Sequence, residues 1–446
     1  MAVKNKVNAA IIGTGYVGLS TAAAFASKGI RAVCVDVIRE KVDMINRGKS
    51  PIFEKGMKPL LEAAVKKKLL SATTDIDAAV SDTDISFICV QTPSLPSGEI
   101  DLKYVKNAAA GIGKSLRDTG YRAVVVKSTV LPGTTENVVL PALENNSGKN
   151  LGSEFGLGMC PEFLREGCAV VDSLHPDRII IGTNDRKSRD LIYGIYRRFD
   201  APVLDVGIRT AEMIKYASNT FLAAKISLSN EIANICELYG IDVYDVMKGV
   251  GMDNRIGAQF LNAGAGFGGS CFPKDAKAVA YAARKLKYEP LIINALLEIN
   301  ERQAAHVVDL VQRAVGSLRD KRVALLGLAF KPETDDVRET RAVPIALGLL
   351  GRGAIVVAYD PRAMNNFSKE SKLKGLRYAD CAESALRDAD CCVIQADWDE
   401  FRKIRPETFR KLMKRPIVVD GRRTFDPDKL TRAGVEYLGV GWKGNR

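Results

Sequence analysis

Histidine and long apolar runs are scarce in this sequence, and each shortage excludes a class of protein. His175 and His306 are the only histidines in 446 residues, so a histidine-rich metal centre is impossible and a histidine-dependent triad is disfavoured. We expect no metal, with His175 in a turn and His306 structural on a helix. No apolar run reaches the roughly 18 residues of a membrane span, and the ordered features of a signal peptide are missing. These absences predict a soluble, cytoplasmic protein with no membrane partner.

Cysteine is present, but not in the pattern of a disulfide framework or a zinc site. The nine cysteines are an odd number, and none form a C-x-x-C pair. Cys34, Cys89, Cys391 and Cys392 lie in apolar, strand-like runs, where a reduced thiol packs as a small hydrophobe. This usage favours a reducing compartment.

The composition favours a globular chain with an anionic ligand. A length of 446 residues suggests about three domains, and 46% hydrophobic residues are ample for buried cores. The formal net charge is +12, which suits a nucleotide or another anion. The basic residues are scattered rather than gathered into a stripe, so we expect no nucleic-acid partner.

The order of apolar patterns predicts two α/β domains with helices between them. Short strand-like runs alternate with helical patterns early and again late in the chain, as in βαβ units on a parallel sheet. The runs are 7–12, 31–36, 85–90, 123–127, 322–327, 354–359, 391–395 and 416–420. Helical patterns cover 210–239 and about 275–315. We therefore predict domains at residues 1–200, 201–317 and 318–446.

The first strand is followed by a glycine pattern typical of dinucleotide binding. Gly13, Gly15 and Gly18 form G-x-G-x-x-G between this strand and an alanine-rich helix. Such glycines allow a tight turn, close approach of a pyrophosphate, and packing of the helix on the sheet. Asp36 ends the second strand, where a carboxylate binds a ribose hydroxyl and repels the 2′-phosphate of NADP. The sequence therefore predicts NAD, although Arg39 and Lys41 weaken the distinction from NADP.

A glycine-rich segment places a cysteine at the start of a helix. Four glycines between 264 and 269 are expected to expose backbone N–H groups and let a ligand approach. Cys271 follows, and Pro273 suits the first turn of a helix. A helix N-terminus and a neighbouring Lys274 both favour the thiolate, so Cys271 is a candidate nucleophile. Asp275 is placed to hold a water or accept a proton.

Two further pairs of polar residues have a spacing of four. Lys215 and Asn219 share one face of the long helical stretch; taken locally, such a pair favours a solvated surface over an oxyanion site. Glu162 and Glu166 are either acid/base groups or part of a charged turn, and the spacing alone does not decide.

Nine segments occur in an order that resembles one known family. They are GTGYVG (13–18), VQTP (90–93), KSTV (127–130), CPEFLREG (160–167), HPDR (175–178), EMIKYASNTFLAAKIS (212–227), GFGGSCFPKD (266–275), GLAFKPETDDVRE (327–339) and DGRR (420–423). Along essentially the whole chain, they resemble the UDP-glucose 6-dehydrogenase family. The resemblance implies two Rossmann-like doubly wound domains, joined by a long central helix and a helical dimerisation region.

The resemblance also implies an activity. The family oxidises the C6 alcohol of UDP-glucose to a carboxylate with two NAD⁺, through a covalent intermediate on the cysteine that matches Cys271. It implies that Lys215 and Asn219 stabilise the oxyanion and position water, that Asp275 assists as a base, and that Glu162 serves acid/base work and thioester hydrolysis. Thr129 matches a threonine near the catalytic water.

The binding residues follow from the same resemblance. For NAD they are Asp36, Lys41, Thr92, Thr129, Glu166, Lys274 and Arg338, beside the three glycines. For the substrate they are Glu162, Phe163, Leu164, Arg165, Glu166, Lys215, Asn219, Phe260, Leu261, Asn262, Ala263, Gly264, Gly268, Lys331 and Arg422. Arg255 matches an arginine contributed across a homodimer interface.

Three alternatives stay open at this point. A sibling enzyme that oxidises GDP-mannose or another nucleotide sugar shares the scaffold and the cysteine. A one-step β-hydroxyacid dehydrogenase has a similar first domain, but needs neither Cys271 nor the last 120 or so residues. A non-catalytic nucleotide-sugar sensor is disfavoured by the intact Cys271, Lys215 and Asp275.

Overall fold

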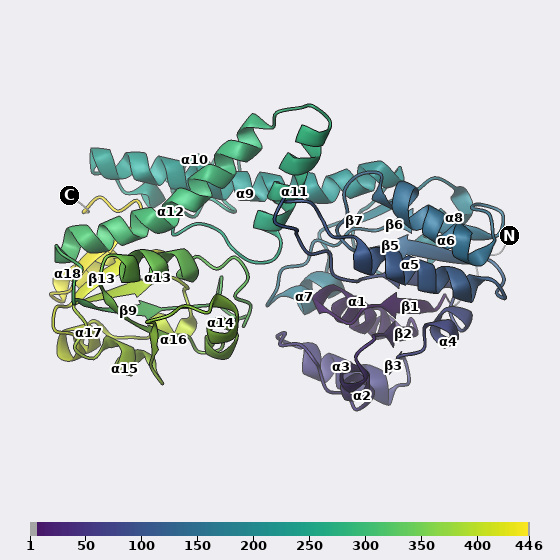
Figure 1. The fold of residues 1–446 in the computed structure, drawn as a ribbon, viewed down its shortest axis with the longest axis horizontal. Helices are drawn as coiled ribbons and strands as arrows, with labels where there is room; N and C mark the ends of the chain where they lie inside the picture. Colours follow the sequence, from purple (N-terminus) through teal and green to yellow (C-terminus); the bar gives the residue numbers. More distant parts are fainter. Residues whose placement is uncertain (1–6, 445–446) are drawn as a thin grey trace. The chain divides into compact units, whose positions relative to one another are not determined.

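The computed structural model describes residues 7–444, and the chain divides into two compact units, Met1–Ser218 and Asn219–Arg446 (Figure 1). Each unit contains one predominantly parallel sheet with helices on it. The long helix α9 (Ile208–Tyr239) begins in the first unit and continues in the second. The predicted fold class, two doubly wound α/β domains joined by a long helix, is confirmed.

The first unit is built on an eight-stranded sheet in the order β3-β2-β1-β4-β5-β6-β7-β8. Its strands are β1 (Ala9–Ile12), β2 (Ala32–Val35), β3 (Leu70–Thr73), β4 (Ile85–Ile88), β5 (Arg122–Val126), β6 (Phe155–Met159), β7 (Ile179–Thr183) and β8 (Val203–Val206). Its helices are α1 (Tyr16–Ser27), α2 (Arg39–Asn46), α3 (Met57–Lys66), α4 (Ile76–Ser81), α5 (Lys103–Leu116), the π-helical η1 (Thr135–Val139), α6 (Leu140–Ser147), α7 (Ala169–Leu174) and α8 (Arg186–Tyr196). Within this sheet, β6 and β7 pair antiparallel, and the other neighbouring strands pair parallel. The order β3-β2-β1-β4-β5-β6 is the doubly wound order of dinucleotide-binding domains.

The sequence of the central strands explains why helices cover both faces of this sheet. Every residue of β1, β2 and β4 is buried, as expected for continuous apolar strands covered on both sides. Alternate side chains enter two separate cores. Ile11 packs with α1 and α3 on one face, while Ile12 packs with α4 and α5 on the other. The carboxyl ends of these strands are thereby fixed at one edge of the sheet.

The second unit repeats the strand order on a smaller scale, as β11-β10-β9-β12-β13-β14, all parallel. The strands are β9 (Arg322–Leu326), β10 (Ile355–Tyr359), β11 (Arg377–Tyr378), β12 (Cys391–Ile394), β13 (Ile417–Asp420) and β14 (Glu436–Gly439). The helices after α9 are α10 (Val243–Gly251), α11 (Phe272–Lys285), α12 (Leu291–Val315), α13 (Ala342–Gly351), α14 (Met364–Ser371), α15 (Ala382–Leu386), α16 (Asp399–Arg402), α17 (Pro406–Leu412) and α18 (Pro427–Arg432).

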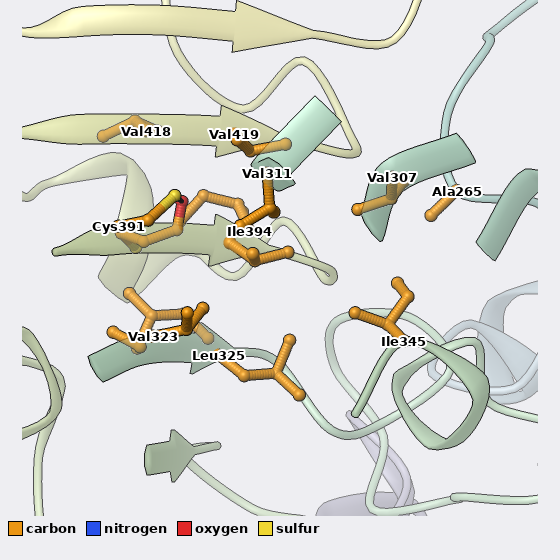
Figure 2. Close-up of a cluster of buried hydrophobic side chains, with 14 of the residues drawn as sticks. Ala265, Val307, Val311, Val323, Leu325, Ile345, Cys391, Ile394, Val418 and Val419 are labelled. Carbon is orange, nitrogen blue, oxygen red and sulfur yellow. Dashed lines mark hydrogen bonds between the residues drawn. The ribbon is translucent and has the colours of Figure 1, made fainter. Parts of the chain in front are cut away.

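The core of the second unit joins this sheet to helix α12 and to the glycine-rich segment. Figure 2 shows Val307 and Val311 of α12 near β12 and β13, with Ala265 beside Val307; all three residues are buried. Cys391 is among the fully buried strand residues, as predicted for a thiol in an apolar run. The segment that precedes Cys271 is therefore part of the folded core rather than a free loop.

The helical region expected at about 275–315 consists of two helices. α11 ends at Lys285 and α12 begins at Leu291. Lys287 has a positive φ of 61°, and Pro290 directly precedes α12. A left-handed residue ends the first helix, and proline restricts the residue before it to an extended conformation.

The sequence patterns did not predict β3, β6, β7, β8, β11 or β14. β6 (Phe-Gly-Leu-Gly-Met) contains two glycines, which weaken any strand signal. The structure explains the two glycines. A Cβ on Gly156 would lie 2.1 Å from Ser188 Oγ, and a Cβ on Gly158 would lie 2.7 Å from Ile192 Cδ1. Helix α8, which carries both partners, packs so closely on β6 that only glycine fits there.

Candidate active site

The loop after β1 has the geometry expected for a pyrophosphate. Gly13 has a φ of 102°, and a Cβ there would lie 2.8 Å from the carbonyl oxygen of Cys89. A Cβ on Gly18 would lie 1.9 Å from the carbonyl oxygen of Gly13. Around Gly15, by contrast, nothing in the described structure lies within 4 Å of an added Cβ. The outer two glycines therefore serve the fold, and the middle one leaves open space at the N-terminus of α1, where anions bind.

Asp36 lies directly after β2 and reaches back to this loop. Its Oδ2 accepts the backbone N–H of Thr14 at 3.1 Å and the Thr14 hydroxyl, and its Oδ1 accepts the N–H of Ile38 at 3.0 Å. The Asp36 side chain is only half-buried. A carboxylate held beside an open glycine loop fits the ribose of NAD, which makes the residues present suited to that cofactor.

The other predicted NAD contacts are divided between the units. Thr92, Thr129 and Glu166 follow β4, β5 and β6 respectively, and Lys41 lies on α2, all in the first unit. Binding at the carboxyl ends of strands is the rule in doubly wound sheets. Lys274 and Arg338 belong to the second unit. These contacts with NAD stay predictions.

The second unit has a counterpart of Asp36 that is closed by the protein itself. Asp360 follows β10 and is 2% exposed. Its carboxylate accepts five donors, which are the N–H groups of Leu328, Ala329, Arg362 and Ala363 and the indole N–H of Trp398. Asp360 therefore closes the turn after β9 from within, and the open dinucleotide geometry belongs to the first unit.

Glu162 and Lys215 form a buried ion pair in the first unit. Glu162 lies in the loop after β6, Lys215 on α9, and Lys215 Nζ is 2.8 Å from Glu162 Oε1. Glu162 Oε2 accepts the N–H of Leu164 at 2.5 Å. Burial by itself would raise the pKa of Glu162, but the ammonium of Lys215, the Leu164 N–H and the charge of Lys127 together outweigh it. The pKa of Glu162 is therefore lowered, and the carboxylate is ionised at neutral pH.

The local expectation that Lys215 and Asn219 lie on a solvated surface is wrong. Lys215 is 2% exposed and Asn219 is 6% exposed. The start of α9 packs on the sheet through Ile208 and Ala211, which buries the face that carries Lys215. Its charge is compensated by Glu162, a partner 53 positions away that helix periodicity does not reveal.

Asn219, Lys274 and Asp275 form a second buried group. Asn219 Nδ2 donates to Asp275 Oδ2 at 2.6 Å, and Lys274 Nζ lies 2.6 Å from Asp275 Oδ1. Asp275 is 1% exposed. Both carboxylate oxygens thus hold a donor, so Asp275 fixes the orientation of the Asn219 amide.

Cys271 lies next to this group, at the N-cap of α11. It is partly exposed, and its Sγ is 3.4 Å from Ser270 Oγ. Six other cysteines are buried. Burial raises the pKa of Cys34, Cys89 and Cys160 to about 12, which makes those thiols inert at neutral pH. An accessible sulfur at a helix N-terminus is the arrangement expected of a reactive thiol.

The expectation that the glycine-rich segment exposes its N–H groups is wrong for most of it. The N–H groups of Gly264, Phe267 and Gly269 donate within the second unit, to Asn230 Oδ1 at 2.7 Å, Asn300 Oδ1 at 2.7 Å and the Arg338 carbonyl at 3.0 Å. A Cβ on Gly268 would lie 2.4 Å from the Glu339 carbonyl oxygen. These glycines allow close packing against the protein's own backbone.

The remaining predicted substrate residues have varied surroundings. Phe163 has the Arg178 guanidinium 3.8 Å from its ring centre; sequence reasoning gave Arg178 no role of its own. Arg422 Nε donates to the Gln395 carbonyl at 2.7 Å, and Lys331 lies over the ring of its neighbour Phe330. Arg255 is exposed and pairs with Asp253 at 2.6 Å.

The segment before the glycines is strained and partly buried. Phe260 has a φ of 65°, which is uncommon outside glycine, and its ring meets that of Phe272 edge to face. Leu261, Ala263 and Gly264 are buried, while Asn262 is exposed.

In the first unit, the open glycine loop and the held carboxylate define a dinucleotide-binding domain. The second unit carries an accessible thiol, which is a candidate nucleophile. Residues 7–200 match the NAD-binding domain, 209–302 the central domain and 324–427 the UDP-binding domain of the UDP-glucose/GDP-mannose dehydrogenase family. The chain belongs to this family, and its cofactor is NAD.

Similar proteins agree with this assignment over nearly the full length. The UDP-glucose 6-dehydrogenase AglM of Haloferax volcanii is 44% identical, covering 96% of this chain and 98% of that protein. TuaD of Bacillus subtilis, also a UDP-glucose 6-dehydrogenase, is 42% identical, covering 97% and 92%. The structure of a UDP-glucose dehydrogenase from Pyrobaculum islandicum superposes with a TM-score of 0.92 at 39% identity, covering 99% of each chain.

Between residues 7 and 444, no helix combines the length and apolar character needed to cross a bilayer. In the same range, no three His, Cys, Asp or Glu side chains are grouped so as to hold a metal ion.

Proposed function

We propose that this enzyme oxidises the C6 alcohol of UDP-glucose to the carboxylate of UDP-glucuronate, through two successive oxidations that are linked by a covalent bond to Cys271. The accessible Cys271 thiol at the N-terminus of α11 carries this proposal. The names of the relatives and the match to a UDP-binding domain support UDP-glucose as the substrate. NAD, when bound, accepts a hydride in each oxidation.

The thiol is needed because the aldehyde must stay bound between the two oxidations. The first oxidation removes a hydride and a proton from the alcohol and gives an aldehyde. The Cys271 thiolate adds to the aldehyde carbon to give a thiohemiacetal, and loss of the second hydride leaves a thioester. Water then attacks the thioester carbon, and the Cys271 sulfur leaves as the carboxylate forms.

The two buried polar groups suit different steps of this sequence. The Lys215 ammonium and the Asn219 amide, four residues apart on α9, are donors suited to a developing oxyanion. Glu162 is ionised and therefore able to accept a proton from water. Asp275 already accepts from Asn219 and Lys274, so we assign it to orienting Asn219, and Glu162 to the hydrolysis. Thr129 is assigned to holding the water.

We also propose a cytoplasmic homodimer. Phe221, Leu228 and Ile235 are exposed apolar residues spaced by seven on α9, and such a stripe is suited to a partner helix. None of the nine cysteines, all within residues 7–444, forms a disulfide, which fits a reducing compartment. If Arg255 completes the partner's site, a mixed dimer of Arg255→Ala and Cys271→Ala chains regains activity. The absence of rescue in a verified mixed dimer would refute that role.

The primary test is the yield of NADH per UDP-glucose with NAD⁺ in excess. We expect two NADH and a uronate product from the wild-type enzyme. Cys271→Ala should lose uronate formation but still bind NAD and UDP-glucose, whereas the matched variant Cys168→Ala, at an exposed cysteine of the first unit, should behave as wild type. A yield of one NADH would contradict the covalent step. Turnover of GDP-mannose but not of UDP-glucose would replace the substrate and keep the mechanism.

A further inference from the structure

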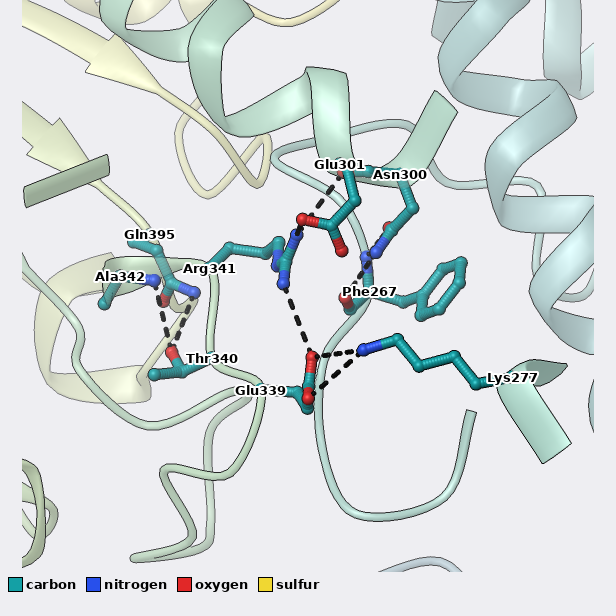
Figure 3. Close-up of polar contacts among 9 residues, drawn as sticks. All are labelled: Phe267, Lys277, Asn300, Glu301, Glu339, Thr340, Arg341, Ala342 and Gln395. Atoms are coloured by element: carbon teal, nitrogen blue, oxygen red, sulfur yellow. Dashed lines mark hydrogen bonds and ion pairs between the residues drawn. The ribbon is translucent and has the colours of Figure 1, made fainter. Parts of the chain in front are cut away.

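A buried amide on α12 holds the segment that leads to Cys271. Asn300 is 1% exposed. Its Oδ1 accepts the N–H of Phe267 at 2.7 Å, and its Nδ2 donates to the carbonyl oxygen of the same residue at 3.1 Å. Figure 3 shows this amide facing the backbone of Phe267. One side chain thus satisfies both backbone groups of a residue that lies outside any helix or strand.

Arg341 contacts the backbone of Asn300 and links it to a network of charged side chains. Its Nη1 lies 3.5 Å from the carbonyl oxygen of Asn300 and 3.2 Å from Glu301 Oε2. Its Nη2 is 3.9 Å from Glu339, which in turn receives Lys277 Nζ at 3.3 Å. Figure 3 shows the Arg341 guanidinium between Glu301 and Glu339, with Lys277 on the other side of Glu339. Arg341 is 3% exposed, whereas its carboxylate partners Glu301 and Glu339 are exposed. Packing therefore fixes Arg341, and the two carboxylates add charge at its outer side.

Phe267 connects this network to the cysteine. It lies four residues before Cys271, and its ring meets that of Phe272 edge to face, with centres 6.1 Å apart. Phe272 is the residue after Cys271 and the first of α11. Next to Phe267, a Cβ on Gly266 would lie 2.7 Å from Asn300 Oδ1. The amide, the glycine and the two rings therefore fix the backbone on both sides of the thiol.

We propose that Asn300 is a positioning residue for the Cys271 thiol. The role rests on the proposed function, because it matters to catalysis only if Cys271 is the nucleophile. When the amide is removed, the backbone of Phe267 loses its two partners, and the thiol shifts relative to the aldehyde carbon. The first oxidation does not use the thiol and is spared. Misplacement of a reacting group by about 1 Å costs on the order of 100-fold in rate, and that loss falls on the second oxidation.

The test compares Asn300→Ala with Gln303→Ala. Gln303 is also 1% exposed, lies one turn further along α12, and bonds Asn234 rather than the glycine segment. For each folded variant, we would measure the rate at which iodoacetamide alkylates Cys271, read by mass spectrometry of its peptide, and the NADH formed per UDP-glucose. Asn300→Asp is the second variant, since it keeps the acceptor for the Phe267 N–H and loses the donor.

In Asn300→Ala we expect alkylation about tenfold slower, NADH per sugar falling from two toward one, and a UDP-glucose KM within about twofold of wild type. Asn300→Asp should be intermediate, and Gln303→Ala should match wild type in all three. Wild-type alkylation and yield in folded Asn300→Ala or Asn300→Asp would overturn the role, as would an equal loss in Gln303→Ala. If the wild-type enzyme did not oxidise UDP-glucose, the proposed function would fail, and the alkylation rates would still decide whether Asn300 positions the thiol.

Discussion

Replacing Lys215 by methionine tests the buried ion pair through stability rather than activity. In Lys215→Met, the Glu162 carboxylate stays buried and loses the partner that lies at 2.8 Å in the native protein. Removing one partner of a buried pair costs about 3–5 kcal/mol. The Leu164 N–H at 2.5 Å still stabilises the charged carboxylate. We therefore expect the free energy of unfolding of Lys215→Met to be about 3 kcal/mol below that of the wild type at pH 8.

The loss should depend on pH in a defined direction. In the wild type, the lowered pKa of Glu162 contributes stability above the unfolded pKa of about 4.3, and this is lost as the pH falls through the folded pKa. In Lys215→Met, burial raises the folded pKa above the unfolded value. The variant therefore becomes progressively less stable as the pH rises between these two values, by about 1.4 kcal/mol per unit. We expect the difference in free energy of unfolding between the wild type and Lys215→Met to be clearly smaller at pH 5 than at pH 8.

Urea unfolding followed by far-UV circular dichroism measures this difference. Tryptophan fluorescence serves as an internal reference, since Trp398 and Trp442 are the only tryptophans and both lie in the second unit. The control is Arg209→Met. Arg209 lies on α9, as Lys215 does, and its pair with Glu136 of η1 is more exposed, so its loss should cost less than about 1 kcal/mol. Adding Glu162→Gln to Lys215→Met should recover much of the loss. Equal losses at pH 5 and pH 8, or a loss no larger than that of Arg209→Met, would refute the reasoning.

Two further predictions follow from the glycine loop and the cysteines. Gly15→Ala should keep the wild-type melting temperature but weaken NAD binding about tenfold or more. Gly18→Ala should instead lower the melting temperature, because its Cβ meets the Gly13 carbonyl at 1.9 Å. Thermal unfolding and NAD titration check both variants, and an unchanged NAD affinity in Gly15→Ala would contradict the assignment of Gly15 to the pyrophosphate. In the native protein at pH 8, iodoacetamide should label only Cys168, Cys271 and Cys381. At Cys34 and Cys89, a pKa of about 12 leaves roughly one thiol in ten thousand ionised. Rapid labelling of Cys34 or Cys89 in a peptide map would contradict this prediction.

Much of the fold could be predicted because its signals are local. The central strands are short, wholly apolar runs between helical patterns, and β1, β2 and β4 are buried on both faces as such runs require. Most of the strands that were not predicted have mixed signals, although β7 (Ile-Ile-Ile-Gly-Thr) is an apolar, buried run. β8 (Val-Leu-Asp-Val) contains two exposed residues, and β6 contains two glycines whose use depends on the closeness of α8.

The sequence by itself determined the glycine loop, the carboxylate after the second strand and the cysteine at a helix start, since each is encoded by neighbours within about 20 residues. Only the tertiary structure decided the environments of polar side chains. Lys215 is buried because Glu162, on a distant loop, compensates its charge. Asp36 stays accessible while its counterpart Asp360 is closed by Trp398. The partners that fix a buried charge or amide lie far along the chain, and no local spacing encodes which of them will meet.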